Sequence, residues 1–205
     1  MKLEADDKTI DYYNNYAQEY AEKTLHLQLD EQWDEFTANI KPKGRILDIG
    51  CGSGRDMIKF QKLGFSTEGL EASPAMAKIA RHNSGLQVHE LPIEKISFNE
   101  RFDGVWACAS LLHVHADNLA LVIEAILKSL KSDGHFYFSL KLGEGQIRDS
   151  NERLFVYHNE RSLRTLLSKF ENINIIKIWT TADSAKREGS RWINCIIKKY
   201  NRTNA

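Results

Sequence analysis

The chain has 205 residues, with 28 Lys and Arg against 28 Asp and Glu, so its formal net charge is zero. The length suits one domain with a sizeable core, and zero net charge makes nucleic acid an unexpected partner. No apolar run reaches the ~20 residues of a membrane span, and acids such as Asp6 stand where a signal peptide would be apolar. The three cysteines lie far apart, so we expect free thiols in a reducing cytoplasm and no metal site.

The N-terminal part is predicted to be helical, over residues 8–24 and 30–40. Four tyrosines recur in the first helix at spacings of three and four: Tyr12, Tyr13, Tyr16 and Tyr20. Two interpretations stay open for this stripe. It packs on a sheet, or its helix caps an active site, in which case Tyr12 and Tyr16 contact substrate.

From residue 44 onward, short apolar runs alternate with helical patterns. Strands are expected at 44–50, 65–70, 86–91, 102–109, 135–141, 173–180 and 191–199, and helices at 57–63, from 74, at 119–130 and at 163–170. Strands that alternate with helices of this length are typical of an α/β fold with a doubly wound, mostly parallel sheet. We therefore predict a single domain over 1–205, with a helical cap at 1–43 and a seven-stranded core at 44–205.

A glycine-rich turn follows the first strand, where Asp48 precedes Gly50, Gly52 and Gly54. Glycine permits positive φ and lets a ligand approach the backbone closely. The dinucleotide pattern needs a further glycine, and Arg55 stands in its place. A carboxylate before the turn repels a pyrophosphate and suits an amino group. The turn therefore favours a positively charged cofactor with an amino-acid part over NAD.

Glu71 stands at the end of the second strand, 17 residues after Gly54. An acid at this place accepts hydrogen bonds from the two hydroxyls of a ribose. The alternative is a solvated strand end. The offset from the glycine turn favours a nucleoside-bearing cofactor.

Several segments now resemble class I S-adenosylmethionine-dependent methyltransferases, a Rossmann-like family. Residues 46–54 look like their first motif, 102–108 like their fourth strand, and 130–135 like the turn before strand five, although Ser132-Asp133 replaces the usual Pro-Gly. The resemblance implies S-adenosyl-L-methionine as cofactor and an antiparallel last strand between strands five and six. The Y-x-x-x-A-x-x-Y start, W-A-C-A-S-L-L-H-V and R-W-x-N look closer still to small bacterial methyltransferases of the tellurite-resistance type.

The resemblance also implies which residues contact the cofactor. They are Asp48, Gly50, Cys51, Gly52 and Gly54 for the methionine part, Glu71 for the ribose, Ala72, Met76, Ile93 and Glu94 for the adenine, and Ala107 and Cys108 for the amino end. Around the adenine the register is open, with Glu90 as a rival of Glu94.

The acceptor side is predicted from the residues that follow the strands. His113 and His115 come after strand four, and a histidine can take a proton near neutral pH. The alternative is that they only pack near the next helix. A loop at 141–149 with two glycines, and an Arg beside a Trp near the last hairpin, suggest further substrate contacts at Lys141, Arg191 and Trp192.

We therefore expect a cytoplasmic enzyme that transfers a methyl group from S-adenosylmethionine to a small molecule by in-line displacement. The N/D-P-P-Y/F/W tetrapeptide of enzymes that methylate base amines is absent after strand four. Two alternatives stay open: a methyltransferase acting on RNA or protein, and a non-catalytic protein that binds S-adenosylmethionine.

Overall fold

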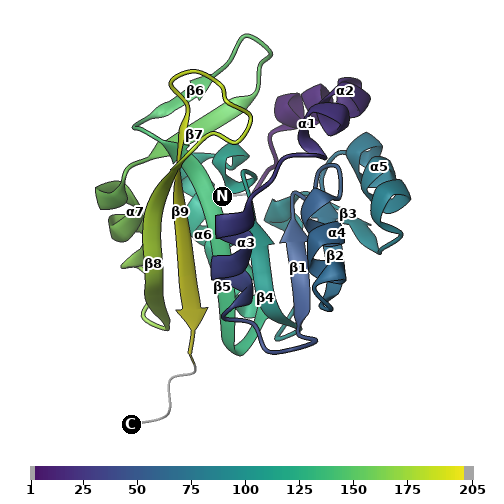
Figure 1. Ribbon diagram of the computed structural model, residues 1–205. Coiled ribbons are helices and arrows are strands. Elements are labelled where there is room, and N and C mark those ends of the chain that lie inside the picture. The colour runs from purple at the N-terminus through teal and green to yellow at the C-terminus, as the bar shows by residue number, and fades with distance from the viewer. Residues whose placement is uncertain (1–2, 201–205) are drawn as a thin grey trace.

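The computed structural model describes residues 3–200 and arranges them as a central sheet with helices on both faces (Figure 1). The strands are β1 (Arg45–Ile49), β2 (Ser66–Glu71), β3 (Val88–Glu90), β4 (Phe102–Ala107), β5 (Leu130–Leu142), β6 (Gln146–Arg148), β7 (Leu154–His158), β8 (Ile173–Ala182) and β9 (Arg191–Lys199). The helices are α1 (Asp7–Asn15), α2 (Ala17–Thr24), α3 (Asp30–Thr37), α4 (Arg55–Lys62), α5 (Pro74–Ser84), α6 (Ala116–Ser129) and α7 (Glu160–Leu167), with short 3-10 turns η1 (Ile93–Lys95) and η2 (Leu111–His113). No helix within this described part is long and apolar enough to cross a membrane.

Seven of the strands form the predicted sheet, in the order β3-β2-β1-β4-β5-β9-β8. The pairs from β3 to β5 are parallel, and β9 runs antiparallel between β5 and β8. The α/β fold, the mostly parallel sheet and the antiparallel last strand are therefore confirmed. Because parallel strands end at one edge, the loops after β1, β2 and β4 meet there.

A β-hairpin of β6 and β7 replaces the predicted loop after β5. Lys141 pairs with Trp192 of β9 on one edge and with Tyr157 of β7 on the other. The edge of β5 that pairs with β7 is the same edge that pairs with β4 earlier in the strand. Because β4 ends at Ala107, the hairpin can pair with β5 beyond that point. Tyr157 belongs to β7, and the helix predicted at 163–170 is α7, which begins after Asn159, whose side chain caps it.

Alternate strand residues face two separate helical layers, as the period of a strand requires. Leu47 and Val105 pack with α6 and α7, whereas Ile46 and Trp106 pack with α3 and α4. This double covering explains why the strands are apolar on both faces.

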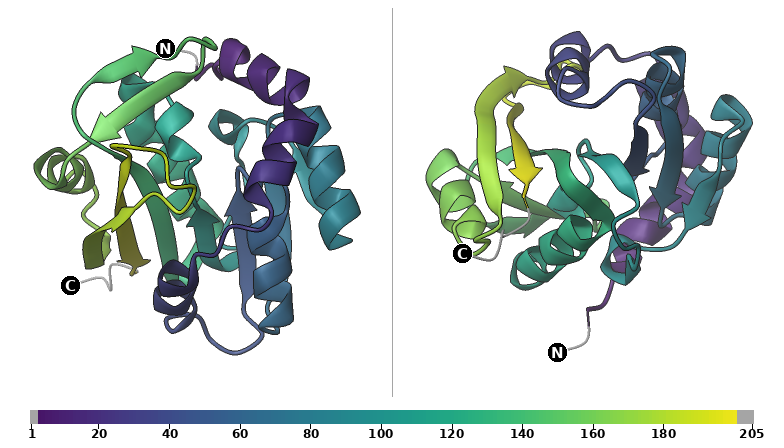
Figure 2. Two further views of the ribbon diagram at one scale, coloured as in Figure 1. Left: turned by 45° about the horizontal axis from the view of Figure 1, so that its top comes forward. Right: turned by 90° about the horizontal axis from the view of Figure 1, so that it is seen from below.

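The N-terminal helices are more broken than predicted, since Tyr16 interrupts the first of them between α1 and α2. The two helices lie near α5, where Ala17 and Ala21 pack on Met76. Figure 2 shows that α1 and α2 and the β6–β7 hairpin stand at the same end of the molecule, the end where the parallel strands finish.

Candidate active site

A cavity of about 750 Å³ opens at the carboxyl end of the parallel strands. Its wall comes from the loops after β1, β2 and β4, from α1 and α2, and from the segment between β8 and β9. This volume lies within the range of roughly 300–1,000 Å³ that is usual for small-ligand pockets. The cavity is the candidate active site.

The glycine turn forms part of the cavity wall, and all three glycines have positive φ. A Cβ on Gly50 would lie 2.4 Å from Cβ of Ser110, and one on Gly54 would lie 3.0 Å from the carbonyl oxygen of Ala80. Backbone conformation and close packing both require glycine at these two positions. At Gly52 a Cβ would meet only atoms at ordinary contact distance, so positive φ alone restricts that position.

Glu71 is held at the cavity by backbone donors. Its Oε2 accepts from the N–H of Gly52 and its Oε1 from the N–H of Ser73, each at 3.0 Å. Burial raises the pKa of Glu71 above its ordinary value, and these hydrogen bonds offset only part of that rise. Each carboxylate oxygen keeps a lone pair for a further donor. The arrangement fits the vicinal hydroxyls of a ribose.

Asp48 is buried beside this loop, with 2% of its surface exposed. Its Oδ2 has no hydrogen-bond partner among the described residues. Burial and the nearby Asp56 raise its pKa well above the ordinary value. An unpartnered buried carboxyl is costly, so this group fits a ligand that brings positive charge to the loop.

A polar cluster that the sequence did not reveal lies at the start of α4. The carboxylate of Asp56 accepts hydrogen bonds from the indole N–H groups of Trp33 and Trp106, both at 2.9 Å, and from the guanidinium of Arg55 at 2.8 Å. The cluster therefore ties α3 and β4 to α4 and holds Arg55 in the cavity wall. Nothing in the spacing of the tryptophans indicated a common partner.

The position of His113 defines its tautomer. Its Nδ1 lies 2.6 Å from the carbonyl oxygen of Leu154, which can only accept, so Nδ1 carries the proton. Burial lowers the pKa of His113 to about 4, so the ring is neutral near pH 7. Its Nε2 therefore accepts the hydroxyl proton of Tyr13 at 2.9 Å. Both side chains line the cavity.

His115 does not line this cavity. Its Nε2 is 3.2 Å from Nε2 of Gln146, and its Nδ1 is 3.5 Å from Asp117. It faces β6 and the start of α6. No group of three or more His, Cys, Asp and Glu side chains in residues 3–200 is arranged to hold a metal.

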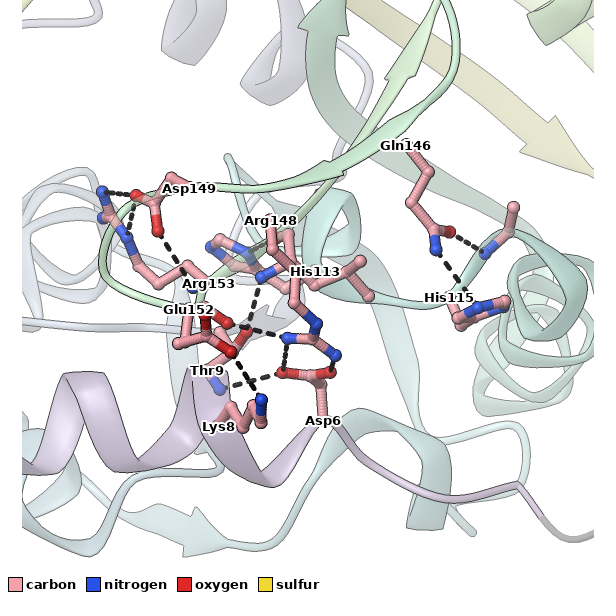
Figure 3. A network of polar contacts seen from close by, with 12 residues as sticks. Asp6, Lys8, Thr9, His113, His115, Gln146, Arg148, Asp149, Glu152 and Arg153 are labelled. Carbon is pink, nitrogen blue, oxygen red and sulfur yellow. Dashed lines mark hydrogen bonds and ion pairs between the residues drawn. The ribbon is translucent and has the colours of Figure 1, made fainter.

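Polar contacts fasten the start of α1 to the β6–β7 hairpin (Figure 3). Asp6 pairs with Arg148, and Lys8 pairs with Glu152. The hydroxyl of Thr9 accepts from the backbone N–H of the first β7 residue at 2.9 Å. We call these three contacts the α1–hairpin clasp.

The predicted cofactor residues fall into two groups. Nine of them line the cavity, namely Gly50, Cys51, Gly52, Glu71, Ala72, Met76, Ile93, Glu94 and Cys108. Asp48, Gly54 and Ala107 stand next to the wall without lining it. Glu94 reaches the cavity, whereas its rival Glu90 pairs with Arg81 outside the lining. The geometry therefore favours Glu94 for the adenine.

The predicted acceptor residues divide as well. Tyr12 and Trp192 line the cavity, whereas Tyr16 is 47% exposed and lies outside it, as do Lys141 and Arg191. Further lining residues came from parts of the chain with no motif, among them Tyr20, Arg153 and Arg187.

These residues fit S-adenosylmethionine, which carries a sulfonium amino acid on a ribose and an adenine. The glycine turn and the unpartnered Oδ2 of Asp48 suit the amino-acid part, and the open acceptor sites of Glu71 suit the ribose. The fold and site together define a class I S-adenosylmethionine-dependent methyltransferase, with S-adenosylmethionine as the cofactor of the class.

Comparison with known proteins agrees with this class. Residues 13–181 match the methyltransferase domain family, and the chain belongs to that family. The protein YqeM of Bacillus subtilis (strain 168) is 27% identical over 135 residues, which are 62% of this chain and 55% of YqeM. The ubiquinone biosynthesis O-methyltransferase of Xanthomonas axonopodis pv. citri (strain 306) is 29% identical over 126 residues, 58% of this chain and 52% of that enzyme. The chain thus spans about half the length of these curated relatives.

A solved structure shares the fold over almost the whole chain. It is the 1,6-didemethyltoxoflavin-N1-methyltransferase of Burkholderia thailandensis, with bound 1,6-didemethyltoxoflavin and S-adenosylhomocysteine. The TM-score is 0.77 at 19% sequence identity, covering 95% of this chain and 87% of that one. At this identity the match shows that the two chains share the fold.

Proposed function

We propose that the chain transfers the methyl group of S-adenosylmethionine to a small-molecule acceptor by in-line displacement. One observation carries the proposal. The same cavity of about 750 Å³ is lined both by the glycine turn and Glu71 and by the side chains of Tyr12, Tyr13 and Trp192. A cofactor bound to the first group of residues would present its methyl group to an acceptor held by the second, and we call these two groups the glycine-turn end and the acceptor end.

The glycine-turn end holds the cofactor in this proposal. Glu71 binds the ribose, Glu94 and Ile93 lie beside the adenine, and the positive methionine part favours the ionised form of Asp48. Bound S-adenosylmethionine supplies a methyl group already activated on sulfur. The protein therefore needs mainly to align the acceptor and exclude water, because alignment and electrostatics can supply most of the rate enhancement.

Tyr13 and His113 form a hydrogen-bonded pair that can orient the acceptor. The Tyr13 oxygen can accept a hydrogen bond from an acceptor O–H or N–H while the Tyr13 hydroxyl donates to Nε2 of His113. His113 is neutral near pH 7 because its pKa is about 4, so Nε2 serves as the hydrogen-bond acceptor that fixes the Tyr13 hydroxyl. The hydrogen bond of Nδ1 to Leu154 keeps the ring in this orientation.

The shape of the site favours a small acceptor over RNA or protein. The α1–hairpin clasp holds α1, which contributes Tyr12 and Tyr13 to the cavity wall, against the β6–β7 hairpin, and we infer that a macromolecule would need this wall displaced. Net charge is zero, so a general affinity for polyanions is not expected. The Burkholderia structure holds a small acceptor, 1,6-didemethyltoxoflavin. We infer further that residues 1–43 cap the active site and that the chain forms one domain. We also infer that the enzyme is cytoplasmic and belongs to the tellurite-resistance type of methyltransferase.

Calorimetric titration with S-adenosylmethionine, followed by a screen for release of S-adenosylhomocysteine over a panel of small acceptors, tests the proposal. Glu71→Ala should weaken binding at least about tenfold, since it removes a charged hydrogen-bond acceptor. The matched control is Glu90→Ala, because Glu90 ends the neighbouring strand outside the cavity. Equal affinity in Glu71→Ala and the native chain would contradict the site. Tight binding without turnover on any acceptor would favour the non-catalytic alternative.

A further inference from the structure

Two arginines from separate loops line the acceptor end of the cavity. Arg153 precedes β7, and Arg187 lies between β8 and β9. The guanidinium of Arg153 lies 4.3 Å from the ring centre of Tyr12, and that of Arg187 lies 6.0 Å from the ring centre of Trp192. Both cations act on the hydroxyl of Tyr20, whose pKa burial raises and they lower. Arg153, Arg187 and Tyr20 all line the same cavity.

Positive charge exceeds negative charge at this end. Arg153 shares its charge with Asp149, and Arg187 shares its charge with Asp183. Lys186 also lines the cavity. Lys141 lies just behind it with Nζ 4.9 Å from the ring centre of Trp192. Burial and the nearby arginines lower the pKa of that lysine, as expected next to uncompensated positive charge.

The other carboxylates of the cavity do not balance this excess. Glu71 and Glu94 lie at the glycine-turn end. Asp56 is used by Arg55, and Asp6 is paired with Arg148. His113 adds no charge near pH 7 because its pKa is about 4.

Aromatic rings form the rest of the wall. Tyr13 and Tyr20 meet edge to face with ring centres 5.0 Å apart, and Tyr12 meets Tyr13 at 5.3 Å. Trp192 faces the segment that carries Arg187. Flat rings bind flat ligands by stacking and edge contacts. The cavity thus combines planar apolar walls with guanidinium groups, whose fork matches a carboxylate.

We propose that the methyl acceptor is a small aromatic or heteroaromatic carboxylic acid whose carboxylate is bound by Arg153 and Arg187. This inference rests on the proposed function and names its substrate class. Asp149 and Asp183 leave further N–H donors of their arginines free, and Lys186 and Lys141 supply the positive charge that a monoanion would balance. The ring lies between the tyrosines and Trp192, with its O–H or N–H toward Tyr13.

The test compares acids with their neutral carboxamides on the protein loaded with S-adenosylhomocysteine. The probes are 4-hydroxybenzoate, 3,4-dihydroxybenzoate, 4-aminobenzoate and quinoline-2-carboxylate, each beside its own amide, titrated by calorimetry. At least one acid should bind about tenfold or more tightly than its amide, as a charged hydrogen-bonded pair predicts. Arg187→Gln and Arg153→Gln should each reduce that preference several-fold, whereas Arg161→Gln, an exposed arginine on α7, should leave it unchanged.

Each result decides the proposal separately from the proposed function. If S-adenosylhomocysteine does not bind, the proposed function fails. If it binds but no acid binds, or acids and amides bind equally, the inference is overturned. A preference that survives both arginine variants also overturns it. Arg153 packs on Tyr12, so thermal melting and the affinity for S-adenosylhomocysteine check its folding, and Arg187 in its more exposed loop provides the second variant.

Discussion

The hydroxyl of Tyr13 lies 2.9 Å from Nε2 of His113, a residue 100 positions further along the chain. The contact joins α1 to the turn after β4 inside the cavity. Because Nδ1 of His113 donates to Leu154, the Tyr13 proton points to His113. The pair therefore forms a defined hydrogen-bonded chain from the cavity into the protein.

Tyr13→Phe removes this chain and keeps the ring packing. We expect kcat to fall by roughly tenfold, because the acceptor loses an orienting hydrogen bond of about 1.4 kcal/mol, with the affinity for S-adenosylmethionine unchanged. Steady-state kinetics on the acceptor found in the screen measures the effect. Tyr16→Phe is the control, since that ring lies on the same helical segment and is 47% exposed. An unchanged kcat in Tyr13→Phe would remove Tyr13 from the reaction.

The free energy of unfolding should depend on pH because the pKa of His113 differs between the folded and the unfolded chain. Its pKa is about 4 in the folded chain and about 6.5 when unfolded, so between these values the unfolded chain binds the proton and the folded chain does not. Stability from this group is therefore full above about pH 6.5 and falls as pH drops toward 4, by up to about 3 kcal/mol. Urea unfolding of the native chain and of His113→Gln should show the native chain losing stability relative to the variant over this range. A difference that stays constant with pH would refute the shift.

Local sequence patterns were sufficient for the core of the fold and for the glycine turn and Glu71, which the structure places in the cavity wall. Strand and helix periods predicted the seven main strands, and the glycines with Glu71 identified a turn whose conformation is local. The β6–β7 hairpin was missed because its existence depends on the edge that β4 leaves open, which no local pattern records.

The residues of the acceptor end could not be predicted from the sequence, because contacts between distant segments bring them together. Asp56 receives hydrogen bonds from Trp33 and Trp106, and Arg153 meets Tyr12, yet none of these pairs has a fixed spacing. An Asp-Arg neighbour or an isolated Tyr has many structural roles. Only tertiary packing shows which of them share one cavity.

Asp48 should strengthen cofactor binding and lower the stability of the cofactor-free fold. Its folded pKa is raised, so the stability it contributes falls as pH rises above about 3.9, its unfolded value. Asp48→Asn should therefore melt at an equal or higher temperature than the native chain without cofactor. Cofactor binding should weaken by about 2 kcal/mol, or roughly 30-fold, because a charged partner is lost. Melting temperatures with and without S-adenosylmethionine measure both effects.

Asp34→Asn is the matched control for this change, since Asp34 is exposed on α3. It should alter neither melting nor the cofactor-induced shift. A clear fall in the melting temperature of cofactor-free Asp48→Asn, or an unchanged shift with cofactor, would argue against the assigned role.

The α1–hairpin clasp should control how long ligand stays in the cavity. Arg148→Gln breaks the pair with Asp6, a contact expected to contribute up to about 1 kcal/mol. We expect S-adenosylhomocysteine to dissociate about two- to fivefold faster, and about 0.5 M salt to have the same effect on the native chain but little on the variant. Stopped-flow fluorescence measures the rates.

Arg164→Gln breaks a similar exposed pair with Glu160 on α7 and serves as the control. Its dissociation rate should equal that of the native chain. Equal rates in Arg148→Gln and Arg164→Gln would show that the clasp does not cover the ligand.

A crystal structure of the chain with S-adenosylhomocysteine would show whether this cavity binds the cofactor. We expect the ribose hydroxyls at hydrogen-bond distance from Glu71, the adenine beside Glu94 and the amino acid part at the glycine turn next to Asp48. Density for the ligand outside this cavity, or a ribose that does not contact Glu71, would contradict the proposed cofactor site.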